Sequence, residues 1–193
     1  MGNPTPTLPN KKYQVIYADP PWPYSAHGIP PSDHVTRHYK TMGVEFIKQL
    51  DVQSISADNS VLFLWATSPF LPQALDVMAA WGFTYKTVAF YWVKLNKQSR
   101  GQLFFTIGDL HIGMGNYTRS NGELCLLGVR GKPLERKSHK VRSVIISNIQ
   151  KHSEKPQEAR EGITQLFGGA TTKIELFARG VVEGWDGWGD GYR

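Results

Sequence analysis

Apolar and polar positions alternate along the chain in blocks that predict strands and helices in turn. The β-branched and aromatic run at 13–18 is typical of a buried strand. A continuous apolar run at 60–66 predicts a strand covered on both faces. Between Ser68-Pro69 and Gly82, apolar residues recur at helical spacing, flanked by start and stop signals for a helix. Further strands are predicted at 84–93, 124–129, 144–146 and 173–178, and further helices at 43–50 and 155–167.

Strands that alternate with helices predict an α/β fold with a mostly parallel sheet and helices on both faces. A length of 193 residues suits one domain. We expect residues 1–12 to form a flexible lead and residues 13–193 to form a single domain. Long loops are predicted at about 23–41 and 95–122, and long loops within compact domains are usually functional.

Composition favours an ordered protein without membrane spans or disulfides, but it does not identify the function. Hydrophobic residues make up 40% of the chain and charged residues 20%, which permits a sizeable core and argues against wholesale disorder. The net charge of +6 is compatible with nucleic acid or another anionic partner but does not decide between them. Cys125 is the single cysteine, so we expect no internal disulfide and a reducing, cytoplasmic setting. No apolar run reaches the ~18 residues of a membrane span, and the histidines lack metal-ligand spacing, so we expect no metal site.

The segment Asp19-Pro20-Pro21-Trp22 directly follows the first predicted strand. Its two prolines prevent the strand from continuing, so Asp19 is held at the strand's end by a stiff turn. Ligands of open α/β sheets bind outside the carboxyl ends of the strands. The alternative is an ordinary turn in which Asp19 caps its own backbone.

These residue types suit a flat heterocycle that carries an amino group. The exocyclic amine of adenine or cytosine is a poor nucleophile because its lone pair is delocalised into the ring. The Asp19 carboxylate and the Pro20 carbonyl would accept hydrogen bonds from the two N–H groups of this amine and favour a pyramidal nitrogen. They would also stabilise the positive charge that develops on that nitrogen. Trp22 would stack on the face of the base, and a base in a duplex would first have to leave the helix.

Asp19-Pro20-Pro21-Trp22, followed by Tyr24, closely resembles the signature of the MT-A70 family. That family contains the mRNA adenosine N6-methyltransferases and their bacterial and phage relatives. Other segments resemble the family in the same order, and together they cover about residues 13–191. They are 38–42 (HYKTM), 62–67 (LFLWAT), 123–131 (ELCLLGVRG), 153–156 (SEKP), 173–179 (KIELFAR) and the closing stretch 185–190.

The resemblance implies a permuted Rossmann-like methyltransferase fold in which the catalytic motif precedes the strand that binds S-adenosylmethionine. It implies catalytic roles for Asp19, Pro20, Pro21 and Trp22. The cofactor contacts that it implies are Ala18, Ser153, Lys155, Pro156, Glu175, Phe177 and Asp190, and the substrate contacts are Tyr24, His38 and Tyr39. Lys155 and Glu175 each have an alternative as solvated surface residues. Asp190 stands where the family usually has Asn, and an ionised Asp can only accept hydrogen bonds.

Basic residues predict a surface for nucleic acid. Arg130 and Lys132 open a basic stretch at 130–142, which we interpret as a phosphate contact beside the site, although a solvated loop is the common alternative. Lys94 and Arg119 flank the loop at 95–122, the candidate recognition segment. Tyr117 in that loop would stack on a flanking base or pack the loop down.

The sequence therefore predicts an S-adenosylmethionine-dependent methyltransferase that acts on the N6 amine of adenine, with DNA favoured as substrate. An RNA adenosine methyltransferase is one alternative. A catalytically inactive, nucleic-acid-binding scaffold subunit is another. We expect a protein of the bacterial or phage-infected cytoplasm without membrane contact. A homodimer and a heterodimer both remain open.

Overall fold

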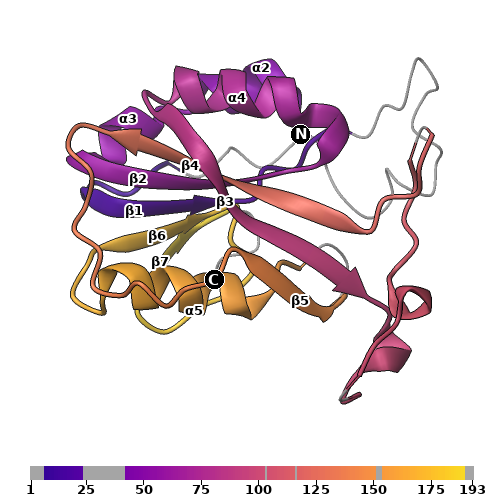
Figure 1. Cartoon of the computed structure of the whole chain (residues 1–193). Coiled ribbons are helices and arrows are strands. Elements are labelled where there is room, and N and C mark those ends of the chain that lie inside the picture. The colour runs from indigo at the N-terminus through magenta and orange to yellow at the C-terminus, as the bar shows by residue number, and fades with distance from the viewer. Residues whose placement is uncertain (1–6, 24–41, 103, 116, 151–153, 190–193) are drawn as a thin grey trace.

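A seven-stranded sheet forms the centre of the computed structural model, which describes residues 7–23, 42–102, 104–115, 117–150 and 154–189 (Figure 1). The strands lie in the order β5-β3-β4-β2-β1-β6-β7. They are β1 (Tyr13–Ala18), β2 (Ser56–Ala66), β3 (Thr84–Leu95), β4 (Gly122–Arg130), β5 (Val144–Asn148), β6 (Lys173–Leu176) and β7 (Asp186–Trp188). Strand β4 runs antiparallel to β2 and β3, and the other pairings are parallel.

Helices cover both faces of this sheet (Figure 1). Helices α2 (Val44–Gln49), α3 (Val52–Ile55) and α4 (Leu71–Ala80) lie on one face, and α5 (Gln157–Phe167) lies on the other. The prediction of a mostly parallel sheet between two helical layers is confirmed.

Strand β1 is apolar at every position except Gln14 because both of its faces are buried. Ile16 and Ala18 belong to the core beneath α2 and α4, whereas Val15 and Tyr17 belong to the core against α5. Successive side chains of a strand point to opposite faces, so a central strand has no position left for solvent. The continuous apolar run at the start of the chain has this cause.

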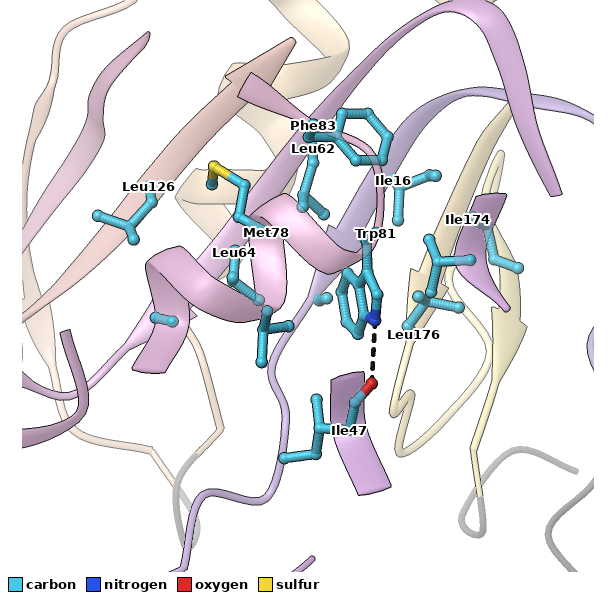
Figure 2. Packing of buried hydrophobic residues seen from close by; sticks show 14 of the residues in the cluster. Ile16, Ile47, Leu62, Leu64, Met78, Trp81, Phe83, Leu126, Ile174 and Leu176 are labelled. Carbon is cyan, nitrogen blue, oxygen red and sulfur yellow. Dashed lines mark hydrogen bonds between the residues drawn. The ribbon is translucent and has the colours of Figure 1, made fainter. Parts of the chain in front are cut away.

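The core beneath α4 is closed by Trp81, which follows the helix. Its ring is fully buried, and its indole N–H donates to the carbonyl of Ile47 at 2.9 Å, which ties α2 to α4 (Figure 2). A buried indole needs such an acceptor. Gly82 then takes a positive φ of 80° and ends the helix, as the sequence predicts.

The structure differs from the sequence prediction at several boundaries. The helix expected from Ser68 begins as a 3-10 turn, η1 (Ser68–Phe70), before α4 starts at Leu71. Strand β2 begins at Ser56, and β3 continues to Leu95. Helix α3 and strand β7 were not predicted, because they are only 4 and 3 residues long and carry no extended periodic pattern.

Parts of the predicted lead and loops are also described. Leu8 packs against the core beneath α4, and Lys11 forms an ion pair with Asp186 at 2.7 Å. The segment at 96–121 contains two 3-10 turns, η2 (Lys97–Ser99) and η3 (Ile107–Asp109). The predicted loop at 23–41 lies outside the described residues apart from Pro23.

Two findings concern the described residues alone. None of their helices has the length and apolar character needed to cross a bilayer. Within the same ranges, no three His, Cys, Asp or Glu side chains gather into a group able to hold a metal ion.

The topology gathers chain segments at one edge of the sheet. The carboxyl ends of the parallel strands meet there, and β4 begins there because it runs the other way: Leu124 pairs with Ala66 at the end of β2. Asp19 after β1 and Glu123 near the start of β4 therefore come to the same edge. This is where open α/β sheets bind ligands.

Candidate active site at the carboxyl edge of the sheet

Asp19 lies in a turn that its own backbone holds rigid. The amide of Trp22 donates to the carbonyl of Pro20 at 2.8 Å, and the amide of Met42 donates to the carbonyl of Pro21 at 3.1 Å. The pyrrolidine rings fix φ at both prolines. A carbonyl oxygen accepts two hydrogen bonds, so the Pro20 carbonyl keeps one acceptor position beyond its bond to Trp22.

Lys155 lies against this carboxylate. Its ammonium nitrogen is 2.9 Å from the Asp19 carboxylate and 3.1 Å from Oε2 of Glu123. Only 7% of the lysine side chain is exposed, and the ammonium also lies 5.7 Å from the ring centroid of Trp65. The buried Pro156 separates Lys155 from the first turn of α5.

Glu123 joins a second lysine to the same group. Lys94 of β3 donates to its Oε1, and the Lys94 ammonium also lies 4.8 Å from the ring centroid of Trp92. Glu123 is 11% exposed and Lys94 is 18% exposed. Asp19, Lys155, Glu123 and Lys94 thus form a row of alternating negative and positive charges, here called the charge row, with a formal sum of zero.

Burial and pairing set the protonation of the charge row. Burial raises the pKa of Asp19 above its usual value, and the nearby Lys155 offsets only part of this effect. Burial alone would also raise the pKa of Glu123, but Lys155 and Lys94 together hold it below its usual value. Burial disfavours the charge on Lys155, yet Asp19 and Glu123 overcome this and raise its pKa. Lys155 therefore stays cationic and Glu123 anionic at neutral pH, and Asp19 is the more easily protonated of the two acids.

A second charged pair lies on the neighbouring strand β6. Both carboxylate oxygens of Glu175 accept from Arg160 of α5, at 3.2 and 3.3 Å. Arg160 also lies 6.0 Å from the ring centroid of Tyr17. Burial raises the pKa of Glu175, and Arg160 opposes that rise.

The chain leaves β6 through a strained residue. Phe177 has a φ of 62°, which is rare for a side chain of this size and costs about 1–3 kcal/mol. Its ring packs edge-on against Trp188, with centroids 5.5 Å apart. Gly189 follows so closely that an added Cβ would lie 2.9 Å from backbone atoms of Ala178. Strain held by tight packing at a sheet edge is typical of a ligand-binding segment.

Comparison with known proteins identifies the family of this chain. The family model of MT-A70 matches residues 13–191, from the first residue of β1 to beyond the last strand. The chain belongs to the MT-A70 family. The resemblance predicted from the motifs is thereby confirmed, together with its methyltransferase fold.

Relatives of two kinds share this MT-A70 region. The type II methyltransferase M.MunI of a Mycoplasma species is 39% identical over 201 residues, which cover 95% of this chain and 79% of the relative. The human N(6)-adenosine-methyltransferase catalytic subunit METTL3 is 29% identical over 168 residues, which cover 87% of this chain but 26% of the relative. The non-catalytic subunit MTB of Arabidopsis thaliana is 30% identical over 128 residues.

The structure places some of the site residues predicted from sequence at the carboxyl edge, places others elsewhere, and does not describe the rest. Asp19, Pro20, Lys155, Lys94 and Glu175 gather at the carboxyl edge of the sheet. The solvated alternatives for Lys155 and Glu175 are wrong, because both side chains are largely buried and paired. Five predicted residues lie outside the described part of the chain: Tyr24, His38, Tyr39, Ser153 and Asp190.

Trp22 of the MT-A70 signature is placed differently from the prediction. Only 6% of the residue is exposed, one face of its ring stacks on Phe70 at 6.2 Å, and its indole N–H donates to the carbonyl of Trp65 at 3.0 Å. The expectation of an open ring that stacks on a base is not met here. Trp22 instead anchors the Asp19 turn to the end of β2. Ala18 likewise buries its methyl group in the core, so its main chain alone is left for a cofactor contact.

Arg130 and Lys132 lie away from the candidate site. Arg130 pairs with Ser60, six residues along β2 from Ala66, and six residue steps of antiparallel strand span roughly 20 Å. Its guanidinium contacts Gln53, and the amide of Lys132 contacts Asn59. The expectation that they flank the site is wrong because the reversal of β4 carries its carboxyl end to the far edge. Arg119 is exposed in the 96–121 segment, where its Nε donates to the carbonyl of Gly113 at 2.7 Å.

Three residues near the candidate site were not singled out from sequence. Glu123, Trp65 and Arg160 each contact a predicted site residue. The sequence could have indicated Glu123 as a candidate, since it is an acid at the start of a mostly apolar strand. Recognising its place required the direction of β4, which an apolar run does not reveal.

Proposed function

We propose that this protein transfers a methyl group from S-adenosylmethionine to the exocyclic N6 amine of adenine in DNA. The observation that carries the proposal is the Asp19–Pro20 turn at the carboxyl edge of the sheet. It places a carboxylate directly before a rigid backbone carbonyl in the chain, and the buried Lys155 pairs with the carboxylate.

The groups at this edge fit the cofactor by their chemistry. S-adenosylmethionine carries an ammonium, a carboxylate, a ribose diol and an adenine ring. Glu175 supplies an acceptor for hydroxyl or ammonium hydrogens, and Lys155 supplies a cation for a carboxylate. Phe177, held in its strained conformation, brings an aromatic ring to the same edge. When bound, the cofactor would supply an electrophilic methyl group on a sulfonium sulfur.

The catalytic contribution of the protein is to hold the substrate amine. Asp19 would accept one N–H of the amine, and the unused acceptor position on the Pro20 carbonyl would accept the other. Two acceptors on the two N–H groups would favour a pyramidal nitrogen, whose lone pair would then be free to accept the methyl group. The positive charge that develops on nitrogen is stabilised by the preorganised Asp19 carboxylate. No nucleophilic side chain is needed, so transfer is direct.

DNA is favoured as substrate by the relatives. M.MunI, a bacterial type II methyltransferase, is aligned over nearly the whole of this chain, whereas the adenosine methyltransferases share about a quarter of their length with it. The scaffold alternative is disfavoured, since the chain keeps Asp19 and pairs it with a buried lysine. Exposed cations of the 96–121 segment, Lys97 and Arg119 among them, would contact phosphates.

The proposal is tested by product analysis. The purified protein is incubated with isotopically methyl-labelled S-adenosylmethionine and a mixture of duplex DNA and RNA, and the nucleosides are then separated by mass spectrometry. We expect labelled N6-methyldeoxyadenosine with the wild type and at least ~100-fold less with Asp19→Asn. Label in adenosine of RNA would move the assignment to the RNA alternative. Label in neither nucleic acid, despite calorimetric binding of the cofactor, would overturn the proposed activity.

A further inference from the structure

Two members of the charge row, Glu123 and Lys94, have no place in the amine-binding arrangement described above. They are nevertheless largely buried, and their pairing extends the Asp19–Lys155 contact across β4 to β3. A buried charge is retained only where it is compensated, because its transfer from water costs several kcal/mol. Their presence behind the carboxylate calls for a physical reason.

Lys155 occupies the oxygens on which the substrate amine depends. Its nitrogen lies 2.9 Å from Oδ2 and 2.9 Å from Oδ1 of Asp19. An amine that donates to Asp19 must compete with this ammonium. If Asp19 were the one anionic neighbour of Lys155, the ammonium could not move away from Asp19 without becoming an uncompensated buried cation.

Glu123 removes this obstacle. Its Oε2 lies 3.1 Å from the Lys155 ammonium, and a carboxylate oxygen can accept more than one hydrogen bond, so it retains acceptor capacity. A small movement of the ammonium from Asp19 toward Glu123 keeps it paired with an anion throughout. Lys94 binds the other oxygen of Glu123 and keeps the charge row neutral.

We propose that Glu123 is a positioning residue for methyl transfer. It is a second anionic partner for the Lys155 ammonium and thereby frees Asp19 for the substrate amine. The inference rests on the proposed function and adds a residue that acts through Lys155 without touching the substrate. Lys94 is the counter-charge that lets Glu123 hold this position. The charge row thus controls how tightly Asp19 is engaged before the substrate arrives.

The inference predicts electrostatic coupling from Glu123 to Asp19. The groups that face Asp19, directly or through a partner, are Lys155, Glu123, Cys125, Glu175, Arg179, Arg160 and Lys94. Among them, Glu123 raises the pKa of Asp19 and Lys155 lowers it. Removing the charge of Glu123 leaves Lys155 paired with Asp19 alone. The Asp19 carboxylate then becomes harder to protonate and less available to an amine.

The first test needs no activity. The side-chain carboxyl carbons are titrated by NMR in the substrate-free protein, and the Asp19 signal is assigned by its loss in Asp19→Asn. We expect Glu123→Gln to move the Asp19 titration to lower pH by on the order of one unit. Lys94→Met should move it to higher pH, because it removes a cation from the same row. The matched control Glu135→Gln, which removes a charge from an exposed ion pair, should leave it unchanged.

The second test is the rate of a single methyl-transfer turnover. We expect Glu123→Gln to lower that rate roughly 10- to 100-fold, with the dissociation constants for cofactor and DNA changed less than about threefold, which is about half of the 1.4 kcal/mol that corresponds to tenfold. In the pH profile of that rate, the acid limb of Glu123→Gln should move to lower pH, following the Asp19 titration. Glu123→Asp, which restores the negative charge, should recover part of the rate and return the Asp19 titration toward that of the wild type.

The outcomes separate this inference from the proposed function. An unchanged Asp19 titration in folded Glu123→Gln overturns the inference, as does a rate that falls only in proportion to the folded fraction. If Glu123→Gln does not fold, the titrations of Glu123→Asp and Lys94→Met decide in its place. A wild type that methylates no nucleic acid would overturn the proposed function, while the NMR titrations would still confirm or contradict the coupling.

Discussion

Trp22 donates its indole N–H to the backbone carbonyl of Trp65, at 3.0 Å, and this bond joins the Asp19 turn to the end of β2. Both rings are buried, so the acceptor has no access to solvent. The position of the Asp19 carboxylate therefore depends on a side chain three residues further along the chain. The turn is held by packing as well as by its two prolines.

Replacement of Trp22 by Phe tests this anchoring role. The ring remains, but the Trp65 carbonyl loses its donor, and a buried unsatisfied group costs about 1–3 kcal/mol. We expect a loss of that size in urea denaturation and a fall in kcat, with cofactor affinity in calorimetry nearly unchanged. Trp22→His, which can still donate from its ring, is the matched variant. A Trp22→Phe protein of full activity and stability would contradict the role.

Removal of the Lys155 ammonium should shift the pH dependence of the reaction. In Lys155→Met, Asp19 loses the cation that offsets part of its burial, so the pKa of Asp19 rises further. Since turnover requires the ionised carboxylate, the acid limb of the kcat profile moves to higher pH. This is opposite to the shift expected for Glu123→Gln, and a limb that stayed in place would show that Asp19 is not the titrating group.

The same variant should be less stable in a defined pH window. Asp19 and Glu123 would be buried without a shared cation, and breaking a buried pair costs about 3–5 kcal/mol. Because the pKa of Asp19 is higher in the folded than in the unfolded state, its contribution to stability falls as the pH rises from the unfolded value of 3.8 through the folded one. Urea titrations of Lys155→Met should therefore show a larger deficit at pH 7 than at pH 4. An equal deficit at both would contradict the coupling.

Glu175 offers a test of the cofactor end of the site. Glu175→Gln keeps an oxygen for Arg160 but removes the negative charge that would bind ammonium or hydroxyl hydrogens. A hydrogen bond to a charged group contributes about 1.5–3 kcal/mol, so the affinity for S-adenosylmethionine should fall roughly 10- to 100-fold in calorimetry. Glu158→Gln, an exposed residue in the first turn of α5, is the control. Unchanged affinity in Glu175→Gln would remove this residue from the proposed cofactor set.

The sequence predicted the strands whose environment leaves a local pattern. The run at 13–18 reads as buried because β1 is covered on both faces. An apolar run carries no information on direction, so the reversal of β4 was invisible, and with it the distance between Glu123 and Arg130. Strand β7, with the sequence Asp-Gly-Trp, forms only through its pairing with β6.

In the candidate site too, residues with a local sequence signal could be predicted, and residues placed by the topology of the sheet could not. Asp19 could be found because the prolines that hold it are its neighbours in sequence. Glu123 could not be placed, because its partners Lys155 and Lys94 reach it only through the topology of the sheet. Trp22 was recognised, but its exposure depends on Phe70 and Trp65, which no local pattern supplies.

The direction of β4 also makes a prediction about the nucleic-acid surface. Lys97 and Arg119 belong to the segment that joins the site edges of β3 and β4, whereas Arg130 and Lys132 lie at the far edge. We expect Lys97→Gln and Arg119→Gln each to weaken DNA binding across all sequences and to reduce the slope of log affinity against log salt by about one. Arg130→Gln and Lys132→Gln remove the same charges from the far edge and should leave the slope unchanged. Fluorescence anisotropy over a salt series measures all four variants, and a loss confined to the far-edge pair would show that DNA approaches the opposite end of the sheet.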